Sequence, residues 1–181
     1  MPGEATSKPR GIECFDALYE AHVSAIYGYL FRRVGRSHAE ELTAEVFAQA
    51  WVQRDRYDPS LGSPATWLFA IATNLLRHHY RSEDRRRRAL SRLDPPGQVS
   101  SGEDELLAGI VAGGALPRVA AALLELEAVD RDCIYLFAVA GLSYDEIATS
   151  LSLPLGTVKS RMRRARSRLR SALRGFLDVE H

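Results

Sequence analysis

Apolar residues recur along this chain at steps of three and four, and nowhere alternate with polar residues at steps of two over a useful length. From Phe15 to Val34 the apolar positions mark one face of a helix, and Gly35 is placed to end it. A second helix is predicted at Ser37, which stands three residues before Glu40, and a third at Ser63, where a capping hydroxyl precedes a proline. The sequence therefore predicts an all-α fold.

The second half of the chain repeats this helical pattern after a break. Residues 91–104 combine prolines, glycines and serines, which is typical of a linker between domains. Further helices are predicted from Arg118 to Leu126, from a cap at Asp130 to just before Gly141, and from Ser143 to Leu151. We therefore predict two small helical domains and a flexible linker between them, with the domains at 13–92 and 118–177 and the linker at 93–117.

Positive charge is concentrated in one segment, although the formal net charge of the chain is only +1. Residues 156–174 carry eight basic side chains and no acidic one. On a helical wheel, Val158, Met162 and Ala165 fall on one side, and Arg163 and Arg164 fall on the other with several serines. Like charges at this density repel one another unless a polyanion screens them, so the pattern favours a nucleic-acid-binding face over a merely solvated one.

The basic segment stands in the second position of a helix-turn-helix pattern. A short capped helix, residues 143–151, is followed by a tight connection with Pro154 and Gly156 and then by the basic helix. In this motif the N-terminal part of the second helix enters the major groove, where Lys and Arg meet phosphates or guanine edges. The residues predicted to contact duplex DNA are Thr157, Lys159, Ser160, Arg161, Arg163 and Arg164.

Several classes of function find no support in the sequence. The two cysteines, Cys14 and Cys133, have no metal-ligand spacing, and no glycine-rich phosphate loop or catalytic constellation stands out. We therefore predict no enzyme, no cofactor and no metal site. The N-terminus lacks the apolar core of a signal peptide, and the longest apolar run is about half of what a bilayer requires, so a cytoplasmic protein without membrane insertion is expected.

Two blocks of the sequence resemble one known family. The stretch "SHAEELTAEVFAQAWVQRDRYDP" with "GSPATWLFAIATNLLRHHYR" is similar to region 2 of bacterial RNA polymerase sigma factors. The stretch "GLSYDEIATSLSLPLGTVKSRMRRARSRLR" is similar to region 4. The order of the blocks and the short linker resemble the extracytoplasmic-function (ECF) group of the sigma-70 family. The resemblance implies a protein that binds core RNA polymerase and directs promoter-specific initiation by recognising −35 and −10 elements.

The resemblance also implies roles for individual residues. The basic helix would contact the −35 element as duplex, and the third helix with its preceding loop would contact the −10 element as a melted strand. Candidates for the −10 element are Tyr57, Ser63, Asn74, Arg77, His78 and Arg81. Candidates for binding core polymerase, at its β′ clamp helices, are Glu41, Leu42, Glu45, Val46 and Phe47. The β flap of the polymerase, promoter DNA and an anti-sigma factor are the other expected partners.

For some aromatic and apolar residues, packing in the protein core is the alternative to a role in binding. We expect Val46, Trp51 and Trp67 to serve mainly in packing. The unusually apolar stretch at residues 126–140 could face a partner such as an anti-sigma factor, but burial is the favoured interpretation of its apolar side chains. These are Ile134, Leu136, Phe137 and Val139.

Two other functions compete with the sigma-factor hypothesis. An autonomous helix-turn-helix regulator would bind a palindromic operator as a dimer, without polymerase. A nucleic-acid-processing enzyme would use the arginine clusters to hold its substrate, but no acidic metal site accompanies them. DNA binding that depends on polymerase would distinguish a sigma factor from the autonomous regulator. Catalytic turnover of a nucleic acid would identify the enzyme. The sequence leaves open whether the cluster at 85–88 touches DNA.

Overall fold

The structure is a computed structural model that describes residue 12 and residues 14–90 and 116–177. Within these ranges every regular element is helical, which confirms the predicted all-α class. Most of the predicted linker lies outside the described residues, and its last two positions already belong to a helix. The elements are α1 (Phe15–Gln53), η1 (Arg54–Arg56), α2 (Pro64–Leu90), α4 (Leu116–Leu124), α5 (Ala128–Ala138), α6 (Tyr144–Leu151) and α7 (Leu155–Leu177).

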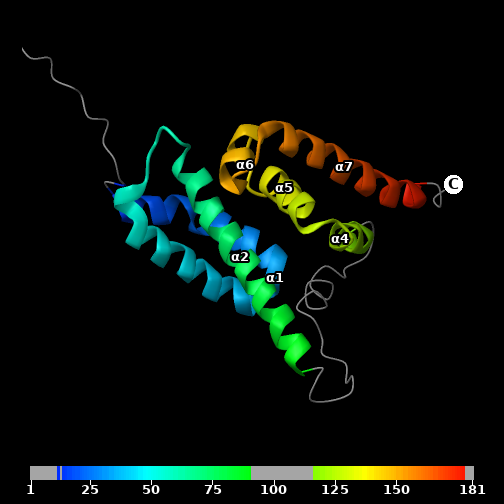
Figure 1. The fold of residues 1–181 in the computed structure, drawn as a ribbon, viewed down its shortest axis with the longest axis horizontal. Coiled ribbons are helices and arrows are strands. Elements are labelled where there is room, and N and C mark those ends of the chain that lie inside the picture. The colour runs from blue at the N-terminus through cyan, green and yellow to red at the C-terminus, as the bar shows by residue number, and fades with distance from the viewer. Residues whose placement is uncertain (1–11, 13, 91–115, 178–181) are drawn as a thin grey trace, which may run out of the picture.

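A glycine folds α1 back on itself. Gly35 has φ 74° and ψ 179°, a backbone conformation essentially restricted to glycine. The helical run that starts at Phe15 therefore ends here, as predicted, and a second run leads to Gln53. In Figure 1 the two arms of α1 (blue and cyan) make a sharp bend, and α2 (green) packs against them.

The first helical bundle has a hydrophobic core between the arms of α1 and α2. Ile26, Leu30 and Leu68 are fully buried. Tyr29 is also fully buried, and its hydroxyl lies 2.9 Å from the Thr73 hydroxyl. Burial raises the pKa of Tyr29 to about 12. This core fixes the face that α2 presents outward.

The start of α2 follows the predicted capping signal. The helix begins at Pro64, and the Thr66 backbone N–H donates to the Ser63 hydroxyl at 3.2 Å. The N-terminus of this helix lies directly after the loop that joins it to η1.

The second helical bundle, α4 to α7, is built around the predicted inner face of the basic helix. Val158, Met162 and Ala165 of α7 are buried. The Ser143–Glu146 capping box is present at the start of α6, which reaches Leu151 as predicted.

The cap predicted for α5 is wrong. This helix begins at Ala128, after Glu127, and Asp130 is a fully buried residue of its first turn. No side-chain hydrogen bond caps α5. The carboxylates of Glu127 and Asp130 are instead directed to Arg161 of α7, at 3.1 and 2.8 Å. Asp130 therefore forms an ion pair with Arg161 of another helix instead of capping its own helix.

The two bundles lie against each other rather than apart. Figure 1 shows α5 and α6 beside α2, and buried side chains of both bundles form one continuous core cluster. Leu68 and Leu76 of α2 belong to this cluster together with Leu136 and Ile147 of the second bundle. No helix among the described residues is both long and apolar enough to cross a membrane.

A histidine pair in the first bundle makes its stability depend on pH. The His79 ring lies 4.7 Å from the His38 ring. Burial and then the nearby His38 lower the pKa of His79 below 6.5, although Glu83 and Glu41 act in the opposite direction. Protonation therefore favours the unfolded chain, and stability present above about pH 6.5 is lost as pH falls towards the folded-state pKa.

We therefore expect the free energy of unfolding to fall between pH 7.5 and 5.5, and His79→Gln to flatten that fall. Urea denaturation at the two pH values measures it, with exposed His78→Gln as the control. Equal pH slopes in the two variants would show that His79 is not responsible.

Candidate nucleic-acid interface

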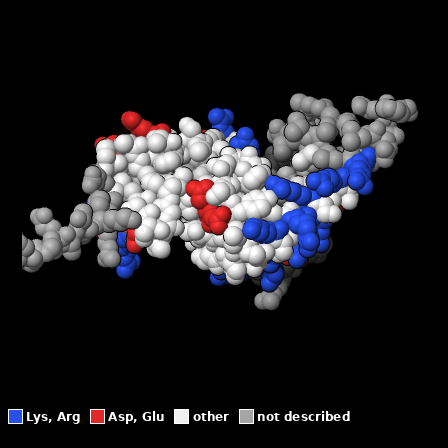
Figure 2. All heavy atoms as spheres, turned by 90° about the horizontal axis from the view of Figure 1, so that it is seen from above, with Lys and Arg blue, Asp and Glu red and all other residues white. Residues whose placement is uncertain are grey.

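The basic helix α7 is presented by a tight turn from α6. Ser152 ends α6 in the left-handed conformation, with φ 53°, and the Thr157 backbone N–H donates to the Pro154 carbonyl at 2.9 Å. The outward face of α7 carries Lys159, Ser160 and Arg163, all exposed. Figure 2 shows Lys and Arg atoms in a band along the part of the molecule formed by α7, on the right of the view.

Arg161 differs from the other basic residues of α7 because it is held by two acids. Its Nη1 donates to Asp130 Oδ1 at 2.8 Å and to Glu127 Oε2 at 3.1 Å. The hydrogen bond to Asp130, and to a smaller extent the one to Glu127, raises the pKa of Arg161 above its ordinary value. Its side chain is only 24% exposed, so its position suits it to fix α7 against α5. Arg164 is more open, with its Nη1 3.7 Å from both acids.

The loop before α2 is ordered by its own side chains. Asp58 Oδ1 accepts from the backbone N–H of Ser60 at 2.9 Å and from its hydroxyl at 2.6 Å. Tyr57 is buried, and its hydroxyl donates to the Gly62 carbonyl at 3.0 Å. The Tyr57 ring lies 5.3 Å from the Trp67 ring, which packs against the core as expected. Tyr57 thus shapes the loop rather than projecting from it.

The other −10 candidates, on α2 and at the residue before it, divide into two sets. Asn74, His78 and Arg81 are exposed and lie on one stripe of the helix, at spacings of four and three. Ser63 and Arg77 instead contact the second bundle. The Ser63 hydroxyl lies 3.3 Å from Glu146 Oε1, and Arg77 Nη2 lies 3.1 Å from Asp132 Oδ2.

Sequence analysis missed the buried Arg33, although a signal for it existed. Arg33 completes the helical stripe of Ile26, Tyr29 and Leu30, at the i+7 position of an apolar face. A charge on such a stripe requires a partner, and here Arg33 Nη2 donates to Asp132 Oδ1 at 2.8 Å. Nothing local in the sequence points to Asp132 as that partner, because 99 residues separate the two.

The candidates for polymerase binding fall into an exposed pair and a buried trio. Glu41 and Glu45 are exposed, with Glu45 Oε1 accepting from Gln49 at 3.2 Å. Leu42, Val46 and Phe47 are buried in the first bundle, so they support this face from below.

Trp51 does not fill the core as expected. It is 50% exposed. Its ring contacts the Phe15 ring at 5.1 Å, and Arg54 lies over it at 4.1 Å. With the half-exposed Tyr19, it forms an aromatic patch beside Phe47.

The apolar stretch of the second bundle is mostly buried, as favoured. Leu136 is fully buried, and Ile134 and Val139 are half-buried. Phe137 is the exception at 41% exposed, and Arg166 of α7 stacks on its ring at 4.9 Å.

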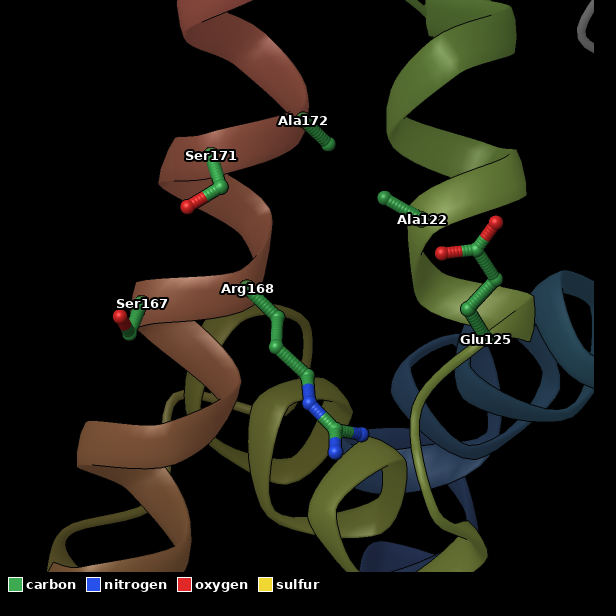
Figure 3. A pocket seen from close by; sticks show the side chains of 6 residues that line it. All are labelled: Ala122, Glu125, Ser167, Arg168, Ser171 and Ala172. Carbon is green, nitrogen blue, oxygen red and sulfur yellow. The ribbon is translucent and has the colours of Figure 1, made fainter.

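A groove runs between α4 and α7. It has a volume of about 580 Å³ and is open to one side. In Figure 3 the Arg168 side chain extends from α7 into the space between the helices, towards the turn that carries Glu125. The residues that line it are Ala122, Glu125, Ser167, Arg168, Ser171 and Ala172.

These features define a helical nucleic-acid-binding protein with a helix-turn-helix bundle and a second bundle that carries an exposed polar stripe. Comparison with known families identifies both bundles. Residues 18–86 match Sigma-70 region 2, and residues 116–169 match Sigma-70, region 4.

Named relatives agree with this assignment. The ECF RNA polymerase sigma factor SigK of Mycolicibacterium vanbaalenii is 35% identical over 171 residues, covering 91% of this chain and 84% of the relative. The protein of the same name from Mycobacterium tuberculosis is 32% identical over 166 residues, covering 91% and 86%. The chain therefore belongs to the ECF sigma factors of the sigma-70 family and acts as a sigma factor in transcription.

Solved structures agree as well. The sigma factor RpoE of Bartonella quintana, in complex with the anti-sigma factor NepR, aligns with a TM-score of 0.65 and 25% identity over 90% of this chain and 98% of that one. CnrH, in complex with the cytosolic domain of CnrY, aligns with a TM-score of 0.65 and 26% identity, covering 89% and 88%. The autonomous-regulator alternative is not favoured by these similarities.

Proposed function

We propose that this sigma factor contacts the −35 element with the outward face of α7 and the −10 strand with the exposed stripe of α2. The observation that carries the proposal is the separation of charge on α7. Arg161 is neutralised by Glu127 and Asp130 on the inner side, whereas Lys159 and Arg163 remain exposed outside. Exposed basic side chains on this face can contact a phosphate backbone and guanine edges.

The −10 contact is proposed from the stripe of Asn74, His78 and Arg81. Unpaired bases offer hydrogen-bonding edges to an amide or imidazole, and Arg81 supplies a charge for the phosphates. The loop at 57–63 leads into the same helix, and the hydrogen bonds of Tyr57 and Asp58 hold it in a fixed conformation.

Core polymerase would bind at the exposed acids Glu41 and Glu45, with the aromatic patch of Phe15, Tyr19 and Trp51 beside them. Aromatic side chains are enriched at protein interfaces. The groove between α4 and α7 is the proposed place for the β flap. An anti-sigma factor is a further proposed partner, since the aligned sigma factor RpoE was solved in complex with the anti-sigma factor NepR.

Run-off transcription from a genomic promoter library tests this function. The purified chain is mixed with sigma-free core RNA polymerase, and core alone serves as the control. Start sites that share −35 and −10 motifs are the expected result. Tight binding of the chain alone to a palindromic duplex, without specific transcripts, would instead support an autonomous regulator.

Arg164→Ala is expected to lower transcription that depends on the −35 element by about tenfold, the loss of one good DNA contact. Run-off from a promoter with an intact −35 motif measures it, and the same promoter with that motif scrambled is the control. If output from the intact promoter is retained, Arg164 is not a contact residue.

Glu45→Ala is expected to weaken core binding by about fivefold, because it removes one interface charge while the side chain's fold contacts are few. Fluorescence anisotropy of the labelled chain titrated with core polymerase measures the dissociation constant. Asp84→Ala, an exposed acid on α2, is the matched control. Equal affinities for both variants would place the polymerase elsewhere.

A further inference from the structure

Two histidines that are far apart in the sequence meet on the surface of the first bundle. His38 lies on the second arm of α1 and His79 lies on α2, and their ring centres are 4.7 Å apart. Figure 1 shows these two elements (cyan and green) packed against each other. Both side chains are half-buried, so the pair is reached from solvent without opening the bundle.

A carboxylate accompanies each histidine on its own helix. Glu41 stands three residues after His38, and Glu83 stands four residues after His79. Side chains at these spacings are neighbours on one face of a helix. Both carboxylates are also near enough to act electrostatically on His79, Glu83 ahead of Glu41. Two imidazoles and two carboxylates therefore share one small region of the surface.

The separation of the two rings suits a shared metal ion. An imidazole nitrogen binds Zn²⁺ at about 2.0 Å, so two imidazoles on one tetrahedral ion have ring centres about 5 Å apart. The observed 4.7 Å is close to this value, and the ring planes are inclined by 57° rather than stacked face to face. Neither ring has a hydrogen-bond partner among the described residues, so each has a nitrogen available as a ligand.

The carboxylates supply the other kind of ligand that such an ion takes. Imidazole suits divalent transition metals, and helical bundles hold metal ions with imidazoles and carboxylates on facing helices. In the described part of the chain no three such side chains already converge on one point, so a carboxylate has to turn towards the imidazoles when the ion binds. Glu41 is exposed, and Glu83 is held by an ion pair to the exposed Arg86 at 3.9 Å, which costs little to break.

We propose that His38 and His79 together bind a divalent transition-metal ion such as Zn²⁺. Glu41 or Glu83 supplies a third ligand, and water fills the remaining position. The ion ties the second arm of α1 to α2, and the same arm carries the acids proposed to meet core polymerase. Metal binding therefore stabilises the helix that presents those acids. The site does not depend on the function proposed above, and it is tested on the free chain.

Isothermal titration calorimetry of the intact chain with ZnCl2 tests the site. The chain carries no histidine tag, and EDTA used to remove bound metal is dialysed away. One ion is expected to bind per chain. His38→Gln and His79→Gln are each expected to weaken binding by at least about tenfold, because each removes one ligand. His22→Gln, at a half-buried histidine of the first arm of α1, is the matched control and should bind as the wild type does.

Thermal unfolding gives a second readout. An ion that binds only the folded chain stabilises it, so Zn²⁺ at about ten times its dissociation constant should raise Tm by roughly 3–6 °C. The rise should be absent in His38→Gln and in His79→Gln at the same Zn²⁺ concentration. Circular dichroism without metal shows whether each variant is folded. Since the two histidines lie on different elements, a variant that fails to fold is replaced by the other.

The carboxylates are tested together, because either of them completes the site. The double variant Glu41→Gln with Glu83→Gln is expected to bind Zn²⁺ at least about tenfold more weakly than the wild type. Asp16→Asn with Asp84→Asn, which also removes one acid from each helix, is the control. Full affinity in the double glutamate variant would overturn the assignment of a carboxylate ligand.

Two results would overturn the site as a whole. One is no binding of Zn²⁺ up to about 1 mM, the range of very weak association. The other is equal binding by the wild type and both histidine variants, which would place the ion at another group, such as the exposed Cys14 thiol. Run-off transcription has no bearing on either result, so failure of the metal site and failure of the proposed function are distinguishable.

Discussion

Gly35→Ala is expected to lower the free energy of unfolding by about 2–3 kcal/mol, because alanine at φ 74° and ψ 179° is strained and the bend depends on this conformation. A straight helix through this point would carry Ala39, Leu42 and Val46 away from the core that buries them. In a chain of 181 residues this loss corresponds to a fall in Tm of roughly 5–10 °C. Thermal unfolding followed by circular dichroism measures it.

Gly28→Ala is the matched control, since Gly28 lies in the first arm of the same helix. A Cβ there would meet only the end of the flexible Arg32 side chain, at 3.1 Å. Alanine has the better helix propensity, so this variant should be neutral or more stable by up to about 0.5 kcal/mol. A similar loss of stability in both variants would mean that the bend does not require the Gly35 backbone conformation.

Elements specified by local chemistry could be predicted from the sequence. The end of the first helical run at Gly35, the start of α2 at Pro64 and the capping box of α6 each depend on a few neighbouring residues, and each is present. The inner face of α7 was predictable for the same reason, because Val158, Met162 and Ala165 follow the helical period.

Features that depend on distant partners could not be predicted. Asp130 has the sequence context of a helix cap, and only the approach of Arg161 from another helix turns it into a buried ion pair. Trp51 has core spacing, but how much of it is covered depends on where the first arm of α1 begins. The contacts between the two bundles are the extreme case, since Asp132 and Glu146 have the sequence context of ordinary solvated acids, yet they bind Arg33 and Thr66 of the first bundle.

Asp130, a buried acid of the second bundle, also contributes to fixing the basic helix α7 in place. Asp130→Ala is expected to lower the free energy of unfolding by about 2 kcal/mol, because it removes the buried acceptor of Arg161 and leaves the exposed Glu127 to hold that guanidinium. The Asp130 side chain is 0% exposed and lies 2.8 Å from Arg161 Nη1. Run-off output that depends on the −35 element should fall by at least about tenfold, since α7 loses the contact that fixes it to α5.

Glu127→Ala separates the effect of burial from that of charge. Glu127 contacts the same Arg161 nitrogen at 3.1 Å, but its side chain is 57% exposed. An exposed pair contributes less than about 1 kcal/mol, so this variant should keep both its stability and most of its output. Urea denaturation and run-off at a temperature where all variants are folded measure the two effects. Equal losses in both variants would mean that Arg161 is held by net charge alone, and the fixed placement of α7 would then need another cause.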